Sequence, residues 1–404
     1  MSYQRSHPWL TLRLDLRDLT YKTWLLLGEA ASKCDHVHWA LLRPEAASDL
    51  LHVYLVRGAL ATTAIEGNTL SEQQALGIAE GTLRLPPSQE YLGREIENIL
   101  GAFEEIVAEV FDHDGAPFAD IPLTVEKIKR YNRLILDGLA LSEDVEPGEL
   151  RTHSVVVGTY RGAPAANCEE LLSRLCDWLN SDAFRTEDPR MRVPLAIVKA
   201  TVAHLYLAWI HPFGDGNGRT ARLLELQILL SARLAAPTTQ LLSNHYNRTR
   251  SEYYRQLEAA SGTQSPLAFI HYAVEGFVDE LRAQLDRIWS MQYADRWEQF
   301  VYETFGEIRA ASERRRLRLV KDISRASIVP AAGVGLPGLT PVPRGELRHL
   351  SPQLAELYAG RTERTLTRDL DDLVGRDLIR RARSGYYPAS DRVLAFMPSA
   401  RARA

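Results

Sequence analysis

The residues best suited to chemistry lie in one short segment, residues 211–222, which reads HPFGDGNGRTAR. His211 comes just before a glycine-rich turn. An imidazole with an ordinary pKa of about 6.5 has a substantial neutral fraction near pH 7, so it can take a proton from an attacking hydroxyl. Asp215 offers a hard oxygen ligand for Mg²⁺, which proteins usually bind through one or two carboxylates together with phosphate oxygens. These residue types predict a general base beside a metal ligand.

The turn itself has the composition of an anion-binding loop. Gly216 and Gly218 bracket Asn217 at the expected start of a helix. Consecutive backbone N–H groups and the positive end of the helix dipole favour a phosphate there. Arg219 and Arg222 are three residues apart and therefore share one helix face, from which both guanidinium groups can reach the same polyphosphate.

Each part of the segment also has an ordinary structural interpretation. An isolated His-Pro pair or Gly-Asn-Gly is most often a turn between helices. We interpret Phe213 as a core anchor of the loop and not as a substrate contact. The nucleotide interpretation is favoured because a base, a metal ligand, an anion loop and two arginines fall within twelve consecutive residues.

Residues 211–222 resemble the signature of the Fic family and match it at every defining position. The resemblance implies a mainly α fold, in which a helical Fic core carries a small β-hairpin flap. It also implies transfer of AMP from ATP to a Ser, Thr or Tyr hydroxyl of a target protein, itself included, with Mg²⁺ or Mn²⁺ as the cofactor. In such a site His211 is the general base and Asp215 is the metal ligand. The nucleotide would contact Asp215, Gly216, Asn217, Gly218, Arg219 and Arg222.

Other activities stay open at this point. A core of this kind could use a different nucleotide donor, such as UTP, or remove an AMP that is already attached. The chain could also be a DNA-binding regulator whose Fic core senses a nucleotide.

A second resemblance lies upstream, in residues 62–68, which read TTAIEGN. They are similar to the inhibitory motif that some Fic proteins carry on an N-terminal helix, which implies inhibitory roles for Thr62, Glu66 and Gly67. Glu66 falls in the last turn of a predicted helix, where the helix dipole disfavours a carboxylate by a few tenths to about 1 kcal/mol, so we expect an external cation. The resemblance names Arg222 as that cation, and the pair would occupy the γ-phosphate site. The alternative is a solvated glutamate at a helix end.

A third resemblance concerns the flap. Residues 146–151, followed by the β-branched run Val155 to Val157, are similar to the flap segment of the family. The resemblance implies a hairpin at 155–162 whose edge pairs with the target's main chain, and an ordinary surface hairpin is the alternative. Its adenine-facing residues would be Val157, Gly158, Thr159 and Tyr160.

A pair of adjacent tyrosines downstream also looks similar to the family. Tyr253 or Tyr254 would contact the nucleotide base, and either could equally belong to the core.

The C-terminal region predicts a different module. After the Gly- and Pro-rich residues 329–345, apolar spacing predicts helices at 350–358 and 362–373 and a hairpin at 379–396. This order resembles a winged helix-turn-helix, in which Arg364, Thr365 and Arg368 would reach DNA. The second helix also carries acidic side chains, at Asp369, Asp371 and Asp372. Because these weaken attraction to DNA phosphates, and such modules also dock proteins, both kinds of partner stay open.

Apolar residues at helical spacing predict the remaining framework, with helices at 44–65, 71–81, 91–111, 125–139, 169–179, 192–210 and 218–234. The sequence therefore predicts three parts. They are an N-terminal helical region with the inhibitory helix at 1–115, a Fic catalytic core at 116–290 and a winged-helix domain at 300–404.

The composition narrows the class of protein. With 404 residues, of which 45% are hydrophobic and 25% are charged, the chain is typical of a globular protein, and its net charge of -4 favours no partner. The apolar stretches at 205–210 and 223–230 fall short of the roughly 18 residues of a membrane span. Residues 1–10 lack the apolar run of a signal peptide, so we expect a cytoplasmic protein with no membrane partner. A homodimer stays open.

The cysteines point the same way. Cys34, Cys168 and Cys176 are widely spaced and odd in number, which predicts buried thiols and no disulfide framework.

Overall fold

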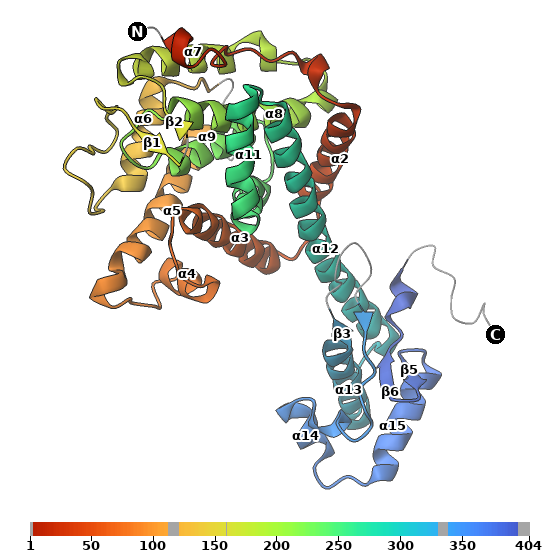
Figure 1. The fold of residues 1–404 in the computed structure, drawn as a ribbon. Helices are drawn as coiled ribbons and strands as arrows, with labels where there is room; N and C mark the ends of the chain where they lie inside the picture. The colour runs from red at the N-terminus through yellow and green to blue at the C-terminus, as the bar shows by residue number, and fades with distance from the viewer. Residues whose placement is uncertain (1–2, 112–120, 159, 330–337, 395–404) are drawn as a thin grey trace. The chain divides into compact units, whose positions relative to one another are not determined.

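The computed structural model of the chain describes residues 3–111, 121–158, 160–329 and 338–394 (Figure 1). The chain forms two compact units, Met1–Leu281 and Arg282–Ala404. Helices dominate both units, and the strands pair only as short two-stranded hairpins among the described residues. The mainly α prediction is confirmed.

The helices of the first unit are α1 Tyr3–Ser6, α2 Tyr21–His38, α3 Pro44–Ile65, α4 Glu72–Ala79, α5 Glu90–Val110, α6 Val125–Leu136, α7 Cys168–Asn180, α8 Pro189–Ile210, α9 Asn217–Ser231, α10 Leu241–Arg248 and α11 Arg250–Thr263. Seven of them, α3 to α9, lie close to the predicted ranges, whereas α1, α2, α10 and α11 were not predicted. Helix α12, Leu267–Phe305, begins in the first unit and ends in the second. Local signals set the starts of these helices. Asp188, for example, accepts the N–H of Arg190 at the start of α8, and Pro189 is the first helical residue.

Helices α8 and α9 pack against each other inside the first unit (Figure 1). Helix α8 is buried on nearly all sides because α2, α7 and α9 cover it, and α9 is buried along almost its whole length. A charged side chain on such a helix cannot reach water and needs a partner within the protein. This requirement applies to Arg219, Arg222 and Glu225, which all lie buried on α9.

The N-terminal helices share a core with the helices that follow them. Helices α3 and α5 contribute Ala59, Ile96 and Phe103 to one apolar cluster, to which α6 and α9 contribute Ile135 and Leu223. The boundary predicted near residue 115 therefore lies inside a single compact unit. As a result, the predicted inhibitory helix α3 is packed against α5, α9 and α10.

Helix α8 is more apolar than the sequence analysis suggested. It is the one helix among the described residues that is long and apolar enough to cross a membrane by length and composition. The expectation that every apolar run is too short was therefore wrong for this helix. In the fold, 89% of its apolar window is buried, which accounts for its hydrophobicity.

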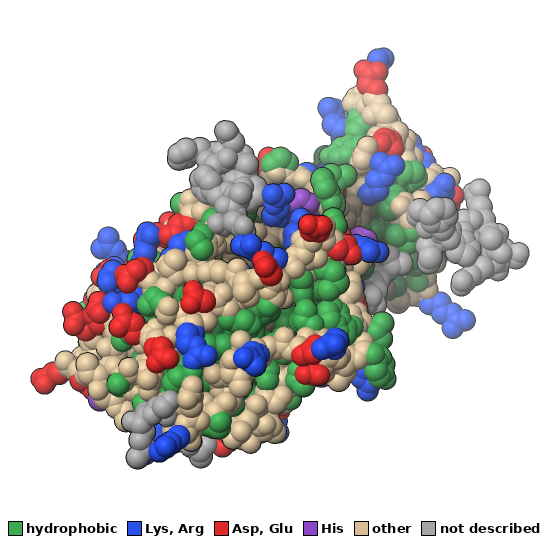
Figure 2. All heavy atoms as spheres, turned by 90° about the horizontal axis from the view of Figure 1, so that it is seen from above, with side chains coloured by type: hydrophobic (Ala, Val, Ile, Leu, Met, Phe, Trp, Pro, Cys, Tyr) green, Lys and Arg blue, Asp and Glu red, His purple; other side chains and the backbone are tan. Residues whose placement is uncertain are grey.

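The cysteines and the surface agree with the composition. The three cysteines are free and buried, and burial raises the pKa of Cys34 and Cys176 to about 12. Over the face drawn in Figure 2, the described Lys and Arg side chains are interspersed with Asp and Glu, as a small net charge would suggest.

The second unit contains the elements predicted for the C-terminal region. After α12 come α13 Ala311–Ser327, β3 Ile328–Val329, β4 Gly338–Leu339, α14 Pro352–Tyr358, α15 Glu363–Gly375, β5 Ile379–Ala382 and β6 Gly385–Pro388. Strands β5 and β6 pair antiparallel with Arg380 opposite Tyr387, and Val342 adds an isolated bridge to Tyr386. The order of two helices and a hairpin is as predicted. The unit begins at residue 282, earlier than the predicted 300, because the second half of α12 packs into its core.

A buried carboxylate ties three helices of this unit together. Asp369 on α15 accepts hydrogen bonds from Arg315 (2.7 and 3.1 Å) and Arg316 (3.0 Å) of α13 and from the Tyr358 hydroxyl (2.9 Å) of α14. Burial by itself would raise the pKa of Asp369, but these hydrogen bonds outweigh it and hold the pKa below its usual value.

We expect Asp369→Asn to destabilise the second unit by about 3–5 kcal/mol, because it leaves the buried Arg315 without its counter-ion. The matched control is Asp371→Asn, an exposed position on the same helix, which should change little. A carboxyl with a lowered pKa stabilises the fold above its unfolded pKa of about 4 and loses that effect as the pH falls through its folded value. Thermal unfolding at pH 7 measures the difference, and equal midpoints for the two variants would contradict this account.

Candidate functional site

His211 lies at the junction between α8 and the glycine-rich turn. It is the C-cap of α8, where its N–H donates to the Leu207 carbonyl (2.8 Å) and its backbone takes left-handed angles, φ 49° and ψ 60°. Such a conformation is costly for a residue with a side chain and persists only where the surroundings enforce it. Here it ends the helix and directs the chain into the turn at 212–216.

Arg151 holds the backbone around His211 in place. Its buried guanidinium donates to the carbonyls of His211 (2.7 Å), Ile210 (3.4 Å) and Ala163. Its own N–H donates to the Pro212 carbonyl (3.0 Å). Because the last carbonyls of a helix have no partners within it, a cation there satisfies them and suits the dipole. Arg151 therefore fixes both the end of α8 and the start of the turn.

The side chain of Asn217 closes the turn. It accepts the N–H of Phe213 and donates to the Phe213 carbonyl, both at 2.9 Å. Phe213 is buried, as expected of a core anchor. The side chain of Asn217 thus shapes the loop, and the part of this residue that remains available to an anion is its backbone N–H at the start of α9.

Any residue other than glycine would be strained at position 216. The φ of Gly216 is 77°, and a Cβ there would lie 2.9 Å from Nδ2 of Asn132. Asn132, on α6, donates to the Asp215 carbonyl (2.9 Å) and accepts the N–H of Gly148 (2.9 Å). This buried amide therefore joins the turn to the segment that leads into the hairpin.

Arg219 lies between two carboxylates. It donates to Oδ1 of Asp215 (3.1 Å) and to Oε1 of Glu95 on α5 (2.9 Å). Burial raises the pKa of Glu95 above its usual value, although the Arg219 guanidinium opposes the shift. The Asp215 side chain is 49% exposed, and no described residue forms a hydrogen bond to its Oδ2. One carboxylate oxygen at the mouth of the turn is therefore available to a ligand.

Arg222 pairs with Glu66, as the resemblance to the inhibitory motif implies. Its Nη2 donates to Oε1 of Glu66 (2.6 Å) and to the Thr62 carbonyl (3.0 Å). Thr62 thus takes part through its main chain. Glu66 is the C-cap of α3, and Gly67 follows with φ 111°, as a glycine at a helix end allows. Burial would raise the pKa of Glu66, but Arg222 outweighs it and holds the pKa below its usual value.

The Glu66 carboxylate lies directly over the first turn of α9. A Cβ at Gly218 would stand 2.4 Å from Oε1 of Glu66 and 3.1 Å from Nη1 of Arg222. The start of a helix is where an anion gains most from free N–H groups and the dipole. The carboxylate therefore occupies space that an anionic ligand of this turn would need.

The His211 imidazole is neutral at physiological pH. Burial lowers its pKa to about 4, with a further lowering by Arg151, while Glu66 and Asp215 oppose the shift. A neutral imidazole at this place can accept a proton.

The predicted hairpin is present beside His211. Strand β1, Val156–Val157, pairs antiparallel with β2, Tyr160–Arg161, and Gly158 turns between them with φ 58°. Thr159 lies outside the described residues. At the base of the hairpin, a Cβ at Gly162 would lie 3.0 Å from Cβ of His211, so this strand runs against the imidazole-bearing residue.

Tyr160 anchors the hairpin. Its hydroxyl donates to the Trp209 carbonyl (2.7 Å) near the end of α8, and its ring packs against His7 and Trp9. His7 also bonds to the Arg161 carbonyl (2.8 Å). The N-terminal segment thus holds the hairpin against α8.

The two tyrosines of α11 have different environments. Tyr253 is 3% exposed, its hydroxyl lies 2.8 Å from Nε2 of His204, and its ring stacks on Tyr246. It belongs to the core, which is the alternative that the sequence left open, and this burial does not favour its prediction as a nucleotide contact. Tyr254 is 42% exposed, and its hydroxyl donates to the Ile65 carbonyl (3.2 Å) at the end of α3.

Sequence reasoning missed the residues that hold the site from a distance. Asn132, Arg151 and Glu95 contact it across 83, 60 and 124 positions of sequence, respectively. No local spacing reveals such partners. Arg151 alone had a signal, because it directly precedes the predicted hairpin. The predicted DNA contacts, Arg364, Thr365 and Arg368, lie on α15 in the second unit.

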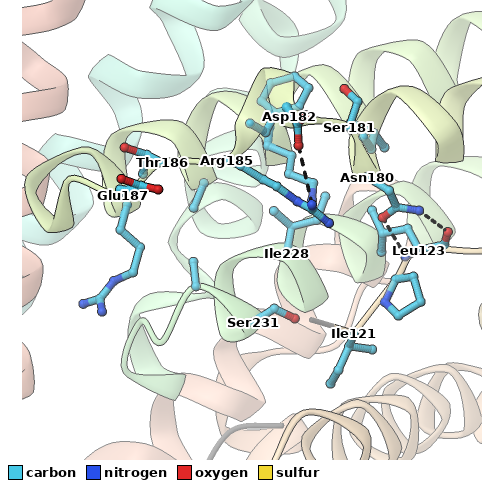
Figure 3. Close-up of a pocket in the computed structure, with 17 residues that line it drawn as sticks. Ile121, Leu123, Asn180, Ser181, Asp182, Arg185, Thr186, Glu187, Ile228 and Ser231 are labelled. Atoms are coloured by element: carbon cyan, nitrogen blue, oxygen red, sulfur yellow. Dashed lines mark hydrogen bonds and ion pairs between the residues drawn. The ribbon is translucent and has the colours of Figure 1, made fainter. Parts of the chain in front are cut away.

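A cavity of about 740 Å³ also opens in the first unit, away from these residues (Figure 3). Residues 121–123, 179–187 and the C-terminal end of α9 line much of it. Polar groups there already pair, as in Asn180 with the Leu123 backbone and Arg185 with Asp182 (3.5 Å). None of the residues described above for the site lines this cavity, and we assign it no role in that site.

Part of the chain is similar to known proteins. Residues 122–229 match the Fic/DOC family. The chain is 30% identical over 237 residues to protein adenylyltransferase fic-1 of Caenorhabditis elegans. The aligned residues cover 56% of the chain and 42% of that protein. It is 28% identical over 233 residues to protein adenylyltransferase Fic of Aedes aegypti, covering 58% and 41%. The chain thus spans less than half the length of these relatives.

Solved structures agree on the fold. A Fic family protein from Desulfovibrio desulfuricans G20 superposes over 92% of the chain and 96% of its own, with a TM-score of 0.52 and 19% identity. Fic-1 from C. elegans covers 66% of the chain and 72% of its own, with a TM-score of 0.50 and 25% identity.

We expect His211 to stay neutral down to about pH 5 in the free protein, because burial and Arg151 disfavour the imidazolium. Histidine side-chain NMR across pH 4–8 measures this, and the spectrum of His211→Ala assigns the resonance. An imidazole that titrates near 6.5, the ordinary histidine value, would show that the site is more open than described.

Proposed function

Because residues 122–229 belong to the Fic/DOC family, we propose that this chain is a protein adenylyltransferase that moves AMP from ATP to a hydroxyl side chain of a protein. One observation carries the proposal. The neutral His211, the glycine turn and the two arginines of α9 converge on one place, although the first and last of these residues belong to different helices.

The reaction uses these groups in a defined order. The triphosphate binds at the start of α9, where backbone N–H groups, Arg219 and Arg222 balance its charge. A Ser, Thr or Tyr hydroxyl attacks the α-phosphorus while His211 accepts its proton. A new P–O bond forms, the bond between the α-phosphorus and its bridging oxygen breaks, and pyrophosphate leaves. Catalysis of this kind is mostly positioning and charge neutralisation.

The donor set fits a magnesium ion. Asp215 offers one half-exposed carboxylate whose Oδ2 has no hydrogen bond from a described residue. No group of three or more metal-binding side chains exists among the described residues. Mg²⁺ suits such a site, since it commonly takes one or two protein carboxylates and completes its shell with phosphate oxygens and water. When bound, the ion would neutralise charge on the phosphates, and Mn²⁺ can take the same ligands.

The Glu66–Arg222 pair supports autoinhibition. In this conformation Arg222 is committed to Glu66 and Thr62, and the carboxylate covers Gly218. A triphosphate would meet like charge at the start of α9 and would lack one of its two arginines. Release of Glu66 from Arg222 would therefore be the activating step.

The hairpin supports a peptide as the acceptor. Strand β1 has an exposed Val156 and pairs only with β2 among the described strands, so its outer edge can accept an extended segment by strand addition. Such pairing recognises main chain, which suits a protein hydroxyl that approaches His211 beside Gly162. The same geometry allows a segment of this chain itself to be modified.

We expect Glu66→Gly to raise AMP transfer from α-labelled ATP by roughly 10- to 100-fold, since it removes a charge-assisted hydrogen bond of about 1.5–3 kcal/mol that competes with the nucleotide. Adding His211→Ala to that variant should abolish transfer. Label incorporation into the protein and into a lysate, followed by mass spectrometry, measures both effects.

The same assay separates the alternatives. Excess unlabelled ATP should suppress labelling more strongly than UTP, and the label should be AMP on Ser, Thr or Tyr. Loss of label from a modified target would instead indicate AMP removal. If Glu66→Gly transfers nothing with Mg²⁺ or Mn²⁺, the autoinhibited transferase is the wrong proposal.

A second proposal concerns the second unit, which we suggest binds DNA through α15. Arg364 and Arg368 are exposed one turn apart on this helix and form no ion pair with a described residue. Two of the three aspartates that weaken the expected attraction to DNA phosphates are paired with arginines. Asp369 is buried against Arg315, Asp372 pairs with Arg376 (2.8 Å), and only Asp371 stays exposed.

We expect Arg364→Ala with Arg368→Ala to weaken binding to a short DNA duplex and to reduce the slope of log K against log salt by about 1.8, the value for two lost phosphate contacts. The control is Arg17→Ala with Arg190→Ala, two exposed arginines of the first unit whose side chains are 90% and 88% exposed. Fluorescence anisotropy at several salt concentrations measures this. Absence of binding by the unmodified chain at low salt would favour a protein partner instead.

A further inference from the structure

Arg222 has to remain in place in two different situations. In this structure its charge is balanced by Glu66, and it is 3% exposed. Under the proposed function, on which the regulatory part of this inference rests, Glu66 leaves before the triphosphate is bound. A buried guanidinium without a counter-ion is costly, so something else has to balance it during that exchange.

Glu225 is placed to do so. It lies three residues after Arg222 on the same helix, a spacing at which side chains are neighbours, and it is 1% exposed. Oε2 of Glu225 and Nε of Arg222 are both buried, and neither has a hydrogen-bond partner among the described residues. The Glu225 charge also acts on Arg222, whose pKa it helps to raise.

Glu225 is held by residues that do not belong to the inhibitory helix. Its Oε1 accepts the Tyr246 hydroxyl of α10 (2.9 Å) and lies 3.2 Å from Nδ1 of His204 on α8. His204 in turn contacts the Tyr253 hydroxyl of α11 (2.8 Å) through Nε2. Because none of these side chains comes from α3, the position of Glu225 does not depend on whether Glu66 is in place.

We infer that Glu225 is the second counter-ion of Arg222, a fixed carboxylate behind the guanidinium that balances its charge whenever Glu66 is withdrawn. Glu66 and Glu225 then form a pair with different tasks. The first is the removable partner on the ligand side, and the second is the permanent partner on the core side. Glu225 is a positioning residue, since it acts through Arg222.

This arrangement lowers the free-energy cost of withdrawing Glu66 from Arg222. With Glu225 present, withdrawal of Glu66 leaves Arg222 with a buried carboxylate one helical turn away, which acts on it by charge and not through a direct ion pair. Without it, Arg222 would either hold Glu66 more tightly or leave its position. The buried polar contacts from Tyr253 through His204 to Glu225 keep the Glu225 carboxylate from moving toward solvent.

A double-mutant cycle tests the inference without nucleotide. The variants are Glu66→Gln, Glu225→Gln and the two together, and the readout is the thermal unfolding midpoint of the first unit. If both carboxylates serve one guanidinium, the double variant should lose about 6 °C or more beyond the sum of the single losses, as expected for a buried charge left unpaired. Additive losses would overturn the inference.

Two controls separate this effect from general damage to the core. In an Arg222→Met background the extra loss should vanish, because no buried cation remains. Tyr246→Phe, which removes a hydrogen bond to Glu225 but keeps its charge, should be additive with Glu66→Gln. Persistence of the extra loss in the first control, or its appearance in the second, would contradict the assigned role.

If Glu225→Gln does not fold, Glu66→Gln alone still decides. With Glu225 as a second counter-ion, the unfolding midpoint of Glu66→Gln should fall by less than about 4 °C, and any larger fall would mean that Arg222 has no second counter-ion. Since these measurements contain no ATP, they can fail while AMP transfer is observed, and the reverse also holds.

Discussion

The first unit depends on one constraint: the Arg222 guanidinium is buried between packed helices, so its charge has to be balanced within the protein. Helix α9 is buried almost throughout, so this guanidinium cannot rely on water. The end of α3 has to lie against α9 to bring Glu66 within 2.6 Å, and the shared core of α3, α5, α6 and α9 provides that fit. The N-terminal helices are therefore part of the site and not an accessory to it.

The backbone that leads into α9 is unusual as well. A left-handed His211 and a positive φ at Gly216 make the tight turn that leads into α9. Arg151, Asn132 and the side chain of Asn217 hold this turn by hydrogen bonds to its main chain. Strain at the site is thus compensated by buried polar contacts from two other segments and from Asn217 of the turn itself. Burial and Arg151 also keep the His211 imidazole neutral.

The second unit also balances a buried charge, that of Asp369, within the protein. Asp369 faces inward, where two arginines and a tyrosine satisfy it, and this leaves arginines exposed on the outer face of α15. In both units a buried ion cluster fixes helices relative to one another. In the second unit, Arg364 and Arg368 stay exposed beside that cluster.

The sequence by itself determined the helices α3 to α9, the turn at 211–222 and the chemistry of its side chains, because local periodicity, glycines and residue types carry that information. It also identified Glu66 as a carboxylate in need of a cation, since a helix end disfavours that charge. Only the tertiary structure decided which groups support them. Glu95, Asn132 and Glu225 have no local signal, because their roles come from contacts across the core. Burial in that core is also what separates Tyr253 from its exposed neighbour, a distinction that spacing along one helix cannot make.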